Sequence, residues 1–132
     1  MTPELTVLAL AVLLQGAYFA AYGYYAFVAE RQLSLRWALS SRDEERPLTG
    51  RGARARRAEA NFVHGLVLFA AAAAAVALSD QSTAFTAACA WLFLISRVLY
   101  LPAYLLGWLP WRSVFWGVAY GATFLMALAA LI

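Results

Sequence analysis

Two short groups of polar residues lie at helical spacing in a chain that is otherwise strongly apolar. The first group, at positions i, i+4 and i+7, consists of Arg57, Asn61 and His64. The second, at positions i, i+3 and i+7, consists of Arg97, Tyr100 and Tyr104. On a helix each group occupies one face, so its side chains point into the same space. Guanidinium, amide and phenol groups all donate hydrogen bonds, and such a combination is suited to an anion.

Arg97 is the most informative single residue, because it lies ten residues before Gly107 inside an apolar segment. A charge at that depth is expensive, so the side chain either reaches the headgroups, pairs within the bundle or lines a cationic pocket. Arg57 and Arg112 would line the same pocket. Three arginines without an equal number of buried carboxylates favour an anionic ligand. Purely structural roles remain open for some of these residues. His64 could be a structural histidine, and the tyrosines could be interfacial residues.

The composition excludes an ordinary soluble domain. The 132 residues are 64% hydrophobic and only 13% charged, which is typical of an all-α integral membrane protein with a single domain. The ten basic residues are all arginines, and eight of them fall between residues 30 and 59. Membrane topology explains this clustering, so we do not expect nucleic-acid binding. Cys89 is the only cysteine, and we expect neither a disulfide nor a metal site.

Four apolar segments predict a four-helix transmembrane bundle, since each is long enough to cross a hydrocarbon layer of about 30 Å. They span approximately residues 5–28, 54–78, 84–106 and 113–132. The arginine-rich loop, about residues 30–53, is expected in the cytoplasm, with both termini outside. The alanine run from Ala70 to Ala75 favours close contact between helices.

The stretches RARRAEANFVHGLVLFA, RVLYLPAYLLG and LPWRS resemble the MAPEG family, the membrane-associated proteins in eicosanoid and glutathione metabolism, in their bacterial-type form. In that family's pattern an arginine is followed by Asn four residues on and by Glu three further. Later come Arg-x-x-Tyr/His-x-x-x-Tyr and an arginine that opens the last helix. The resemblance extends over essentially the whole chain.

The resemblance implies a homotrimer of four-helix subunits in a bacterial inner membrane, with glutathione as co-substrate bound between neighbours near the cytoplasmic side. Arg57 and Asn61 would hold the backbone and carboxylates of glutathione, and Arg112 would stabilise its thiolate. The third helix would line the site with Arg97, Tyr100 and Tyr104. In such a trimer we expect the second helix near the axis, because the small side chains from Ala70 to Ala75 permit close approach of the backbones. His64 stands where the family has Glu, and an imidazole cannot pair with the ligand's ammonium group.

These features favour a glutathione-dependent transferase or peroxidase that acts on a lipophilic electrophile or a lipid hydroperoxide. The replacement of Glu by His64 supports an alternative, a catalytically silent subunit of a membrane assembly. A third possibility, a small proton-coupled exporter, requires a carboxylate within the membrane. The candidates outside the loop, Glu4 and Asp80, are expected at a terminus and in a turn.

Overall fold

The computed structural model describes all residues 1–132, and it is helical with no strand. Its long helices are α1 (Pro3–Gly23), which continues into the π-helical turn η1 (Tyr24–Ala29), α3 (Gly50–Leu78), α4 (Ala84–Leu105) and α5 (Trp111–Leu131). A single short helix, α2 (Leu35–Ala38), lies in the loop between η1 and α3. All four long helices are apolar and long enough to cross a membrane. The predicted all-α, four-helix architecture is confirmed.

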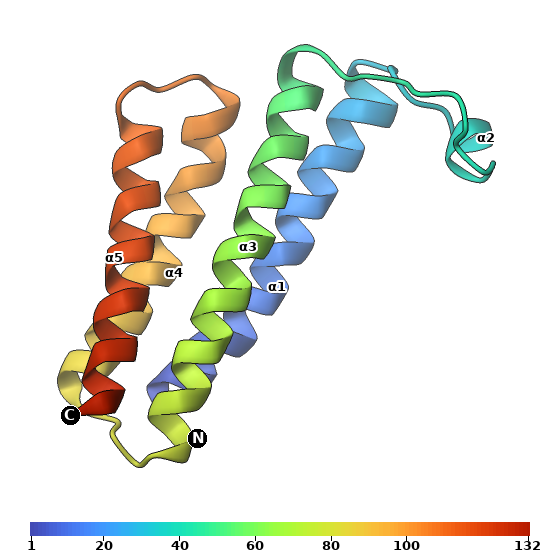
Figure 1. Ribbon diagram of the computed structural model, residues 1–132. Coiled ribbons are helices and arrows are strands. Elements are labelled where there is room, and N and C mark those ends of the chain that lie inside the picture. The colour runs from blue at the N-terminus through green and yellow to red at the C-terminus, as the bar shows by residue number, and fades with distance from the viewer.

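The helices pack as two pairs, α1 with α3 and α4 with α5 (Figure 1). The pairs contact each other mainly through α3 with α5 and α1 with α4, and to a lesser extent through α3 with α4. Stacked aromatic rings join neighbouring helices within the core. Phe69 of α3 stacks on Phe93 of α4 with ring centroids 4.2 Å apart, and Tyr18 of α1 stacks on Phe62 of α3 at 4.4 Å. Such offset pairs add stabilisation beyond the apolar area that they bury. Alanines fill the remaining close contacts, as small residues do between membrane helices.

The arginine-rich loop and the α4–α5 turn lie at one end of the bundle, and both termini lie at the other (Figure 1). Because successive long helices run in opposite directions, the first and third connections, which carry the arginines, lie at the same end. The sequence predicted this arrangement. The helix α3 begins at Gly50, earlier than the predicted start near Arg54. Two features explain the early start: Gly50 adopts a φ of +61°, and the Gly52 amide donates to the Glu30 carboxylate at 2.6 Å. The carboxylate satisfies one of the otherwise unpaired N–H groups at this helix start.

Glu4 joins helices at the opposite end of the bundle, near the terminus as the sequence predicted. Its carboxylate is fully buried in the first turn of α1. It accepts hydrogen bonds from the hydroxyl of Ser82, at 2.9 Å, and from that of Thr86. Thr86 also forms a capping box with Thr83 at the start of α4. Glu4 thus joins α1 to the α3–α4 turn and lies at the end of its span, not halfway across.

Candidate anion-binding site

Arg97 is the largest fully buried side chain in the molecule. Its guanidinium carbon lies 4.9 Å from the ring centroid of Tyr100, 5.7 Å from that of Tyr120 and 5.8 Å from that of Phe62. These aromatic faces attract the cation. No carboxylate pairs with the guanidinium, and its Nε and Nη2 have no hydrogen-bond partner. A buried positive charge is therefore present without a negative one to balance it.

Two contacts from other helices determine where Arg97 lies. Gly65 of α3 packs directly against the guanidinium, and a Cβ atom at that position would collide with Nη2. On α1, the Tyr18 hydroxyl donates to the Arg97 carbonyl oxygen at 2.6 Å. The sequence-based reasoning missed both residues. Gly65 follows His64 directly in the sequence, but its importance depends on a side chain that arrives from another helix.

Asn61 connects the buried arginine to the surface of the site. Arg97 donates from Nη1 to the Asn61 side-chain oxygen at 2.8 Å. The Asn61 oxygen accepts this hydrogen bond, and the Asn61 amide nitrogen remains free to donate to another group. Asn61 is half-buried and borders a pocket of about 200 Å³, together with Tyr100, Arg112, Ser113 and Trp116. Arg97 itself lies behind this pocket and does not line it, contrary to the expectation that it would line the site.

Tyr104 lies between two arginines that come from different helices. Arg57 of α3 donates from Nε to the Tyr104 hydroxyl at 3.0 Å. The Arg112 guanidinium of α5 lies 4.8 Å from the centroid of the Tyr104 ring. Because the hydroxyl accepts from Arg57, its own proton remains available for a ligand. The arrangement brings positive charge and a donor to one point at the end of the bundle.

A second pocket, of about 250 Å³, adjoins the first through Arg112. Three arginines, Arg54, Arg57 and Arg112, line it together with Tyr104, Gly107 and Leu109. Arg54 was not among the predicted site residues. It donates to the Leu105 carbonyl oxygen at 3.1 Å, so it also covers the end of α4. No carboxylate lines either pocket.

Arg112 stands in the first turn of α5, where two backbone amides are already engaged within the chain. The Arg112 amide donates to the Trp108 carbonyl oxygen at 3.1 Å, and the Ser113 amide to that of Pro110 at 3.0 Å. The positive charge at this point therefore comes chiefly from the Arg112 side chain.

His64 is not brought into this arrangement. Its side chain is exposed, makes no hydrogen bond and borders neither pocket. Glu59, the nearest acid in the sequence, faces α1, where its carboxylate accepts from Gln15 at 2.7 Å. Of the predicted site residues, the structure thus groups Arg57, Asn61, Tyr100, Tyr104 and Arg112 around two joined pockets, places Arg97 behind them and leaves His64 outside.

The comparison with known protein families gives one result. The MAPEG family model matches residues 5–132, nearly the entire chain. No curated protein and no solved structure matches the chain. Four membrane-length helices, with arginines, tyrosines and an asparagine grouped at one end, agree with this match. The chain therefore belongs to the MAPEG family and is an integral membrane protein of this glutathione- and eicosanoid-related group.

Proposed function

We propose that the chain is a glutathione-dependent membrane enzyme, which ionises the glutathione thiol and directs it at a lipophilic electrophile or a lipid hydroperoxide. The observation that supports this most strongly is the lack of any carboxylate in the two joined pockets, although three arginines line them and Arg97 lies behind. A site with so much unbalanced positive charge favours an anionic ligand. Glutathione carries two carboxylates, and its thiolate adds a third negative group.

Each residue has a distinct role in this proposal. Arg54 and Arg57 hold a carboxylate in the pocket of about 250 Å³ that they line, and the Asn61 amide and the Tyr104 hydroxyl donate to the peptide backbone. Arg112, which both pockets share, lies beside the sulfur and stabilises the thiolate. A nearby cation lowers the pKa of a thiol, and the thiolate is the reactive form. Arg97 is a positioning residue, because it orients Asn61 from inside the bundle.

The proposal includes a homotrimer that brings the site of each protomer against its neighbour. Ala72 and Ala73 of α3 are buried within the protomer, whereas Ala71 and Ala75 remain exposed. The exposed alanines allow a second α3 to approach closely near a common axis. We place the arginine-rich loop in the cytoplasm, following the positive-inside rule. The lipophilic substrate then enters from the bilayer and glutathione from the aqueous side.

Calorimetric titration of the detergent-solubilised protein with glutathione tests the proposal. Wild type should bind, and the double variant Arg57→Met with Arg112→Met should weaken binding at least tenfold. A matched control removes the same charge with Arg36→Met in α2 and Arg51→Met in the first turn of α3, which line neither pocket, and it should bind as wild type does. The absence of binding by wild type would contradict the proposal.

The family pattern has a glutamate that pairs with the ammonium group of glutathione, and neither pocket here contains one. Its absence supports a second candidate, a silent subunit of a membrane assembly. In this case the site is the remnant of a catalytic one, with His64 in the position of the family glutamate. Turnover assays with a broad panel of electrophiles separate the two functions. Activity of wild type favours the enzyme, whereas activity that appears only after His64→Glu favours the silent subunit.

A further inference from the structure

A separate pocket rich in arginine lies where the loop between η1 and α3 meets the ends of α1 and α3, and it shares no lining residue with the pockets above. Its volume is about 440 Å³, and Arg42, Arg46 and Arg56 line it. Two aromatic residues, Tyr22 and Trp37, form much of its remaining wall. None of these residues borders the pockets around Arg112. The family site therefore does not account for this pocket.

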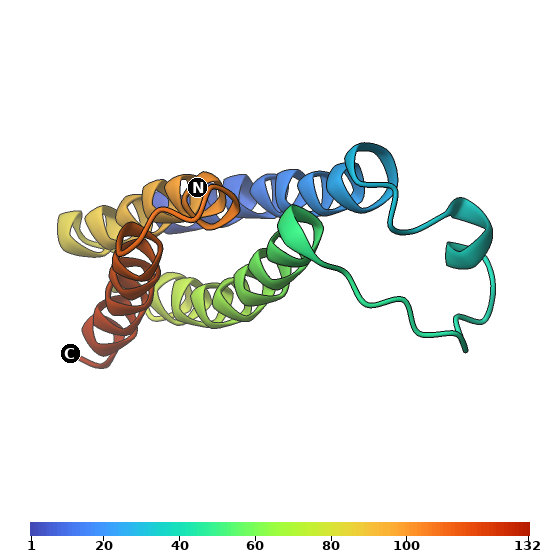
Figure 2. The same ribbon diagram turned by 90° about the horizontal axis from the view of Figure 1, so that it is seen from above.

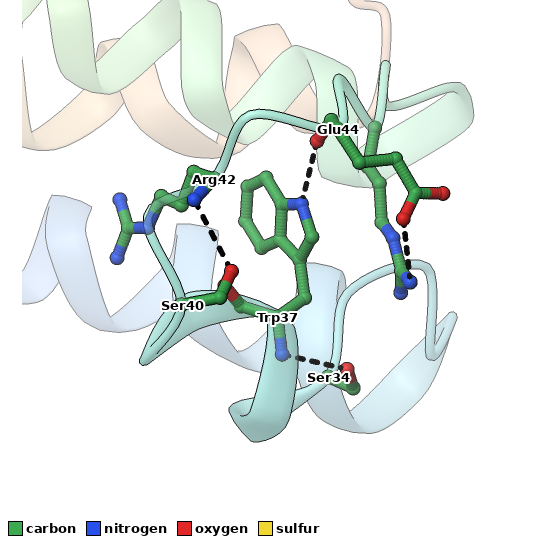
Figure 3. A network of polar contacts seen from close by, with 6 residues as sticks. Ser34, Trp37, Ser40, Arg42 and Glu44 are labelled. Atoms are coloured by element: carbon green, nitrogen blue, oxygen red, sulfur yellow. Dashed lines mark hydrogen bonds and ion pairs between the residues drawn. The ribbon is translucent and has the colours of Figure 1, made fainter.

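Trp37 lines the pocket and is held in place by hydrogen bonds to its neighbours (Figure 3). Its indole Nε1 donates to the Glu44 carbonyl oxygen at 2.7 Å, and its backbone amide donates to the Ser34 hydroxyl at 3.2 Å. The Arg42 guanidinium carbon lies 5.3 Å from the ring centroid. Because the indole N–H is already used, the ring offers the pocket an apolar surface and not a donor.

The balance of charge around the pocket is positive. Arg42 uses its Nε for the Ala38 carbonyl oxygen at 3.0 Å, and its two terminal nitrogens stay free. Arg46 lies 3.6 Å from the exposed carboxylate of Glu44, a weak pair, and Arg56 makes no hydrogen bond within the chain. Glu45 also lines the pocket. Three arginines against these two glutamates leave a net charge of +1, which matches a singly charged anion.

The position of the pocket indicates where such an anion would come from. Tyr22 belongs to α1 and Arg56 to α3, so the pocket begins where two membrane-length helices end. Leu35 and Leu39, on either end of α2, are 70% and 79% exposed beside Trp37. Figure 2 shows that this loop extends sideways well beyond the bundle. Exposed leucines beside an interfacial tryptophan are typical of a segment that rests on a bilayer surface.

We propose that this pocket binds the headgroup of an anionic phospholipid in the leaflet on its own side of the membrane. The phosphodiester carries a single negative charge, and the guanidinium groups of Arg42, Arg46 and Arg56 bind it with charge-assisted hydrogen bonds. The aromatic walls of Tyr22 and Trp37 contact the glycerol and the upper acyl chains. Basic pockets at the ends of membrane helices bind anionic headgroups in this way. The bound lipid anchors the loop beside the bundle.

Native mass spectrometry of the full detergent-solubilised chain tests this proposal. The protein is titrated with phosphatidylglycerol, with phosphatidylcholine, which is neutral, and with deacylated glycerophosphoglycerol. We expect phosphatidylglycerol to bind about tenfold more tightly than phosphatidylcholine. The double variant Arg46→Gln with Arg56→Gln should lose this preference. Arg42 is left in place because it also supports the loop backbone.

The control variant, Arg36→Gln with Arg51→Gln, removes one arginine of α2 and one from the first turn of α3, neither of which lines the pocket. It should keep the preference for phosphatidylglycerol. Equal loss in both variants would overturn the proposal in favour of diffuse attraction to the loop. Equal affinity for the two lipids would overturn it as well. Binding of the deacylated headgroup as tightly as the lipid would show a site for soluble anions instead.

Discussion

Two fully buried charges, Glu4 and Arg97, lie toward opposite ends of the bundle and are treated differently by the chain. Glu4 accepts hydrogen bonds from Ser82 and Thr86, so the protein itself satisfies the carboxylate. Arg97 donates from one nitrogen to Asn61, and its other two nitrogens have no partner. A charged group whose role is to join helices, such as Glu4, finds its hydrogen-bond partners within the protein. The incomplete satisfaction of Arg97, next to pockets without acids, is the difference on which the proposed ligand site rests.

The comparison predicts that removing an arginine at the end of the bundle that contains Arg57 and Arg112 has its largest effect on enzyme kinetics. Arg112→Ala should lower turnover about ten- to hundredfold near pH 7, because a thiol pKa that is one to two units higher leaves that much less thiolate. The effect on glutathione affinity should be smaller. Arg57→Ala should chiefly raise the KM for glutathione. Steady-state kinetics of the two variants with an aromatic electrophile measure this difference. Near-normal kinetics for Arg112→Ala would mean that Arg112 serves membrane topology alone.

Removal of each buried charge should separate stability from binding. Glu4→Ala leaves two hydroxyls without their acceptor and should cost about 2–3 kcal/mol of unfolding free energy, with glutathione binding unchanged. Arg97→Met should change stability by about 1 kcal/mol or less, since an unbalanced buried charge is replaced by an apolar chain, and should weaken binding. Unfolding in mixed micelles and calorimetry measure the two quantities. The contrast fails if both variants lose the same stability or both lose binding.

Several parts of this contrast are visible in the sequence, and others depend on tertiary contacts. Long apolar segments predict the four helices, and helical spacing puts Tyr100 and Tyr104 on one face with Arg97. Spacing along one helix does not reveal contacts with other helices, so it did not show that Arg97 is covered by Phe62 and Tyr120. Nor did it show that Glu4 is buried, because its partners are 78 and 82 residues away.

Gly65 allows a finer test of the position of Arg97. A methyl group at this position would displace the guanidinium and, with it, the hydrogen bond that orients Asn61. We expect Gly65→Ala to weaken glutathione binding about five- to tenfold by calorimetry. Gly16→Ala is the matched control, because a Cβ there meets no atom within 4 Å. If the two variants bind equally, Arg97 does not position the site.

The smallest expected effect concerns the ammonium group of glutathione. Neither pocket contains a carboxylate to pair with it, and His64 lies outside both. Glutathione without its amino group should therefore bind within about threefold of glutathione itself. Competition calorimetry with the two ligands provides the ratio. A loss of tenfold or more would reveal an acid at the site, and a carboxylate of a neighbouring copy would then be the first candidate.

The central claim, that arginine charge at one end of the bundle ionises a bound thiol, is tested most directly by ultraviolet difference absorbance. Glutathione added to the detergent-solubilised protein at neutral pH should produce the thiolate band in an amount that matches the occupied sites. The band should be strongly reduced in Arg112→Ala at saturating glutathione. Bound glutathione without a thiolate band in wild type, or an equal band in Arg112→Ala, would contradict the account.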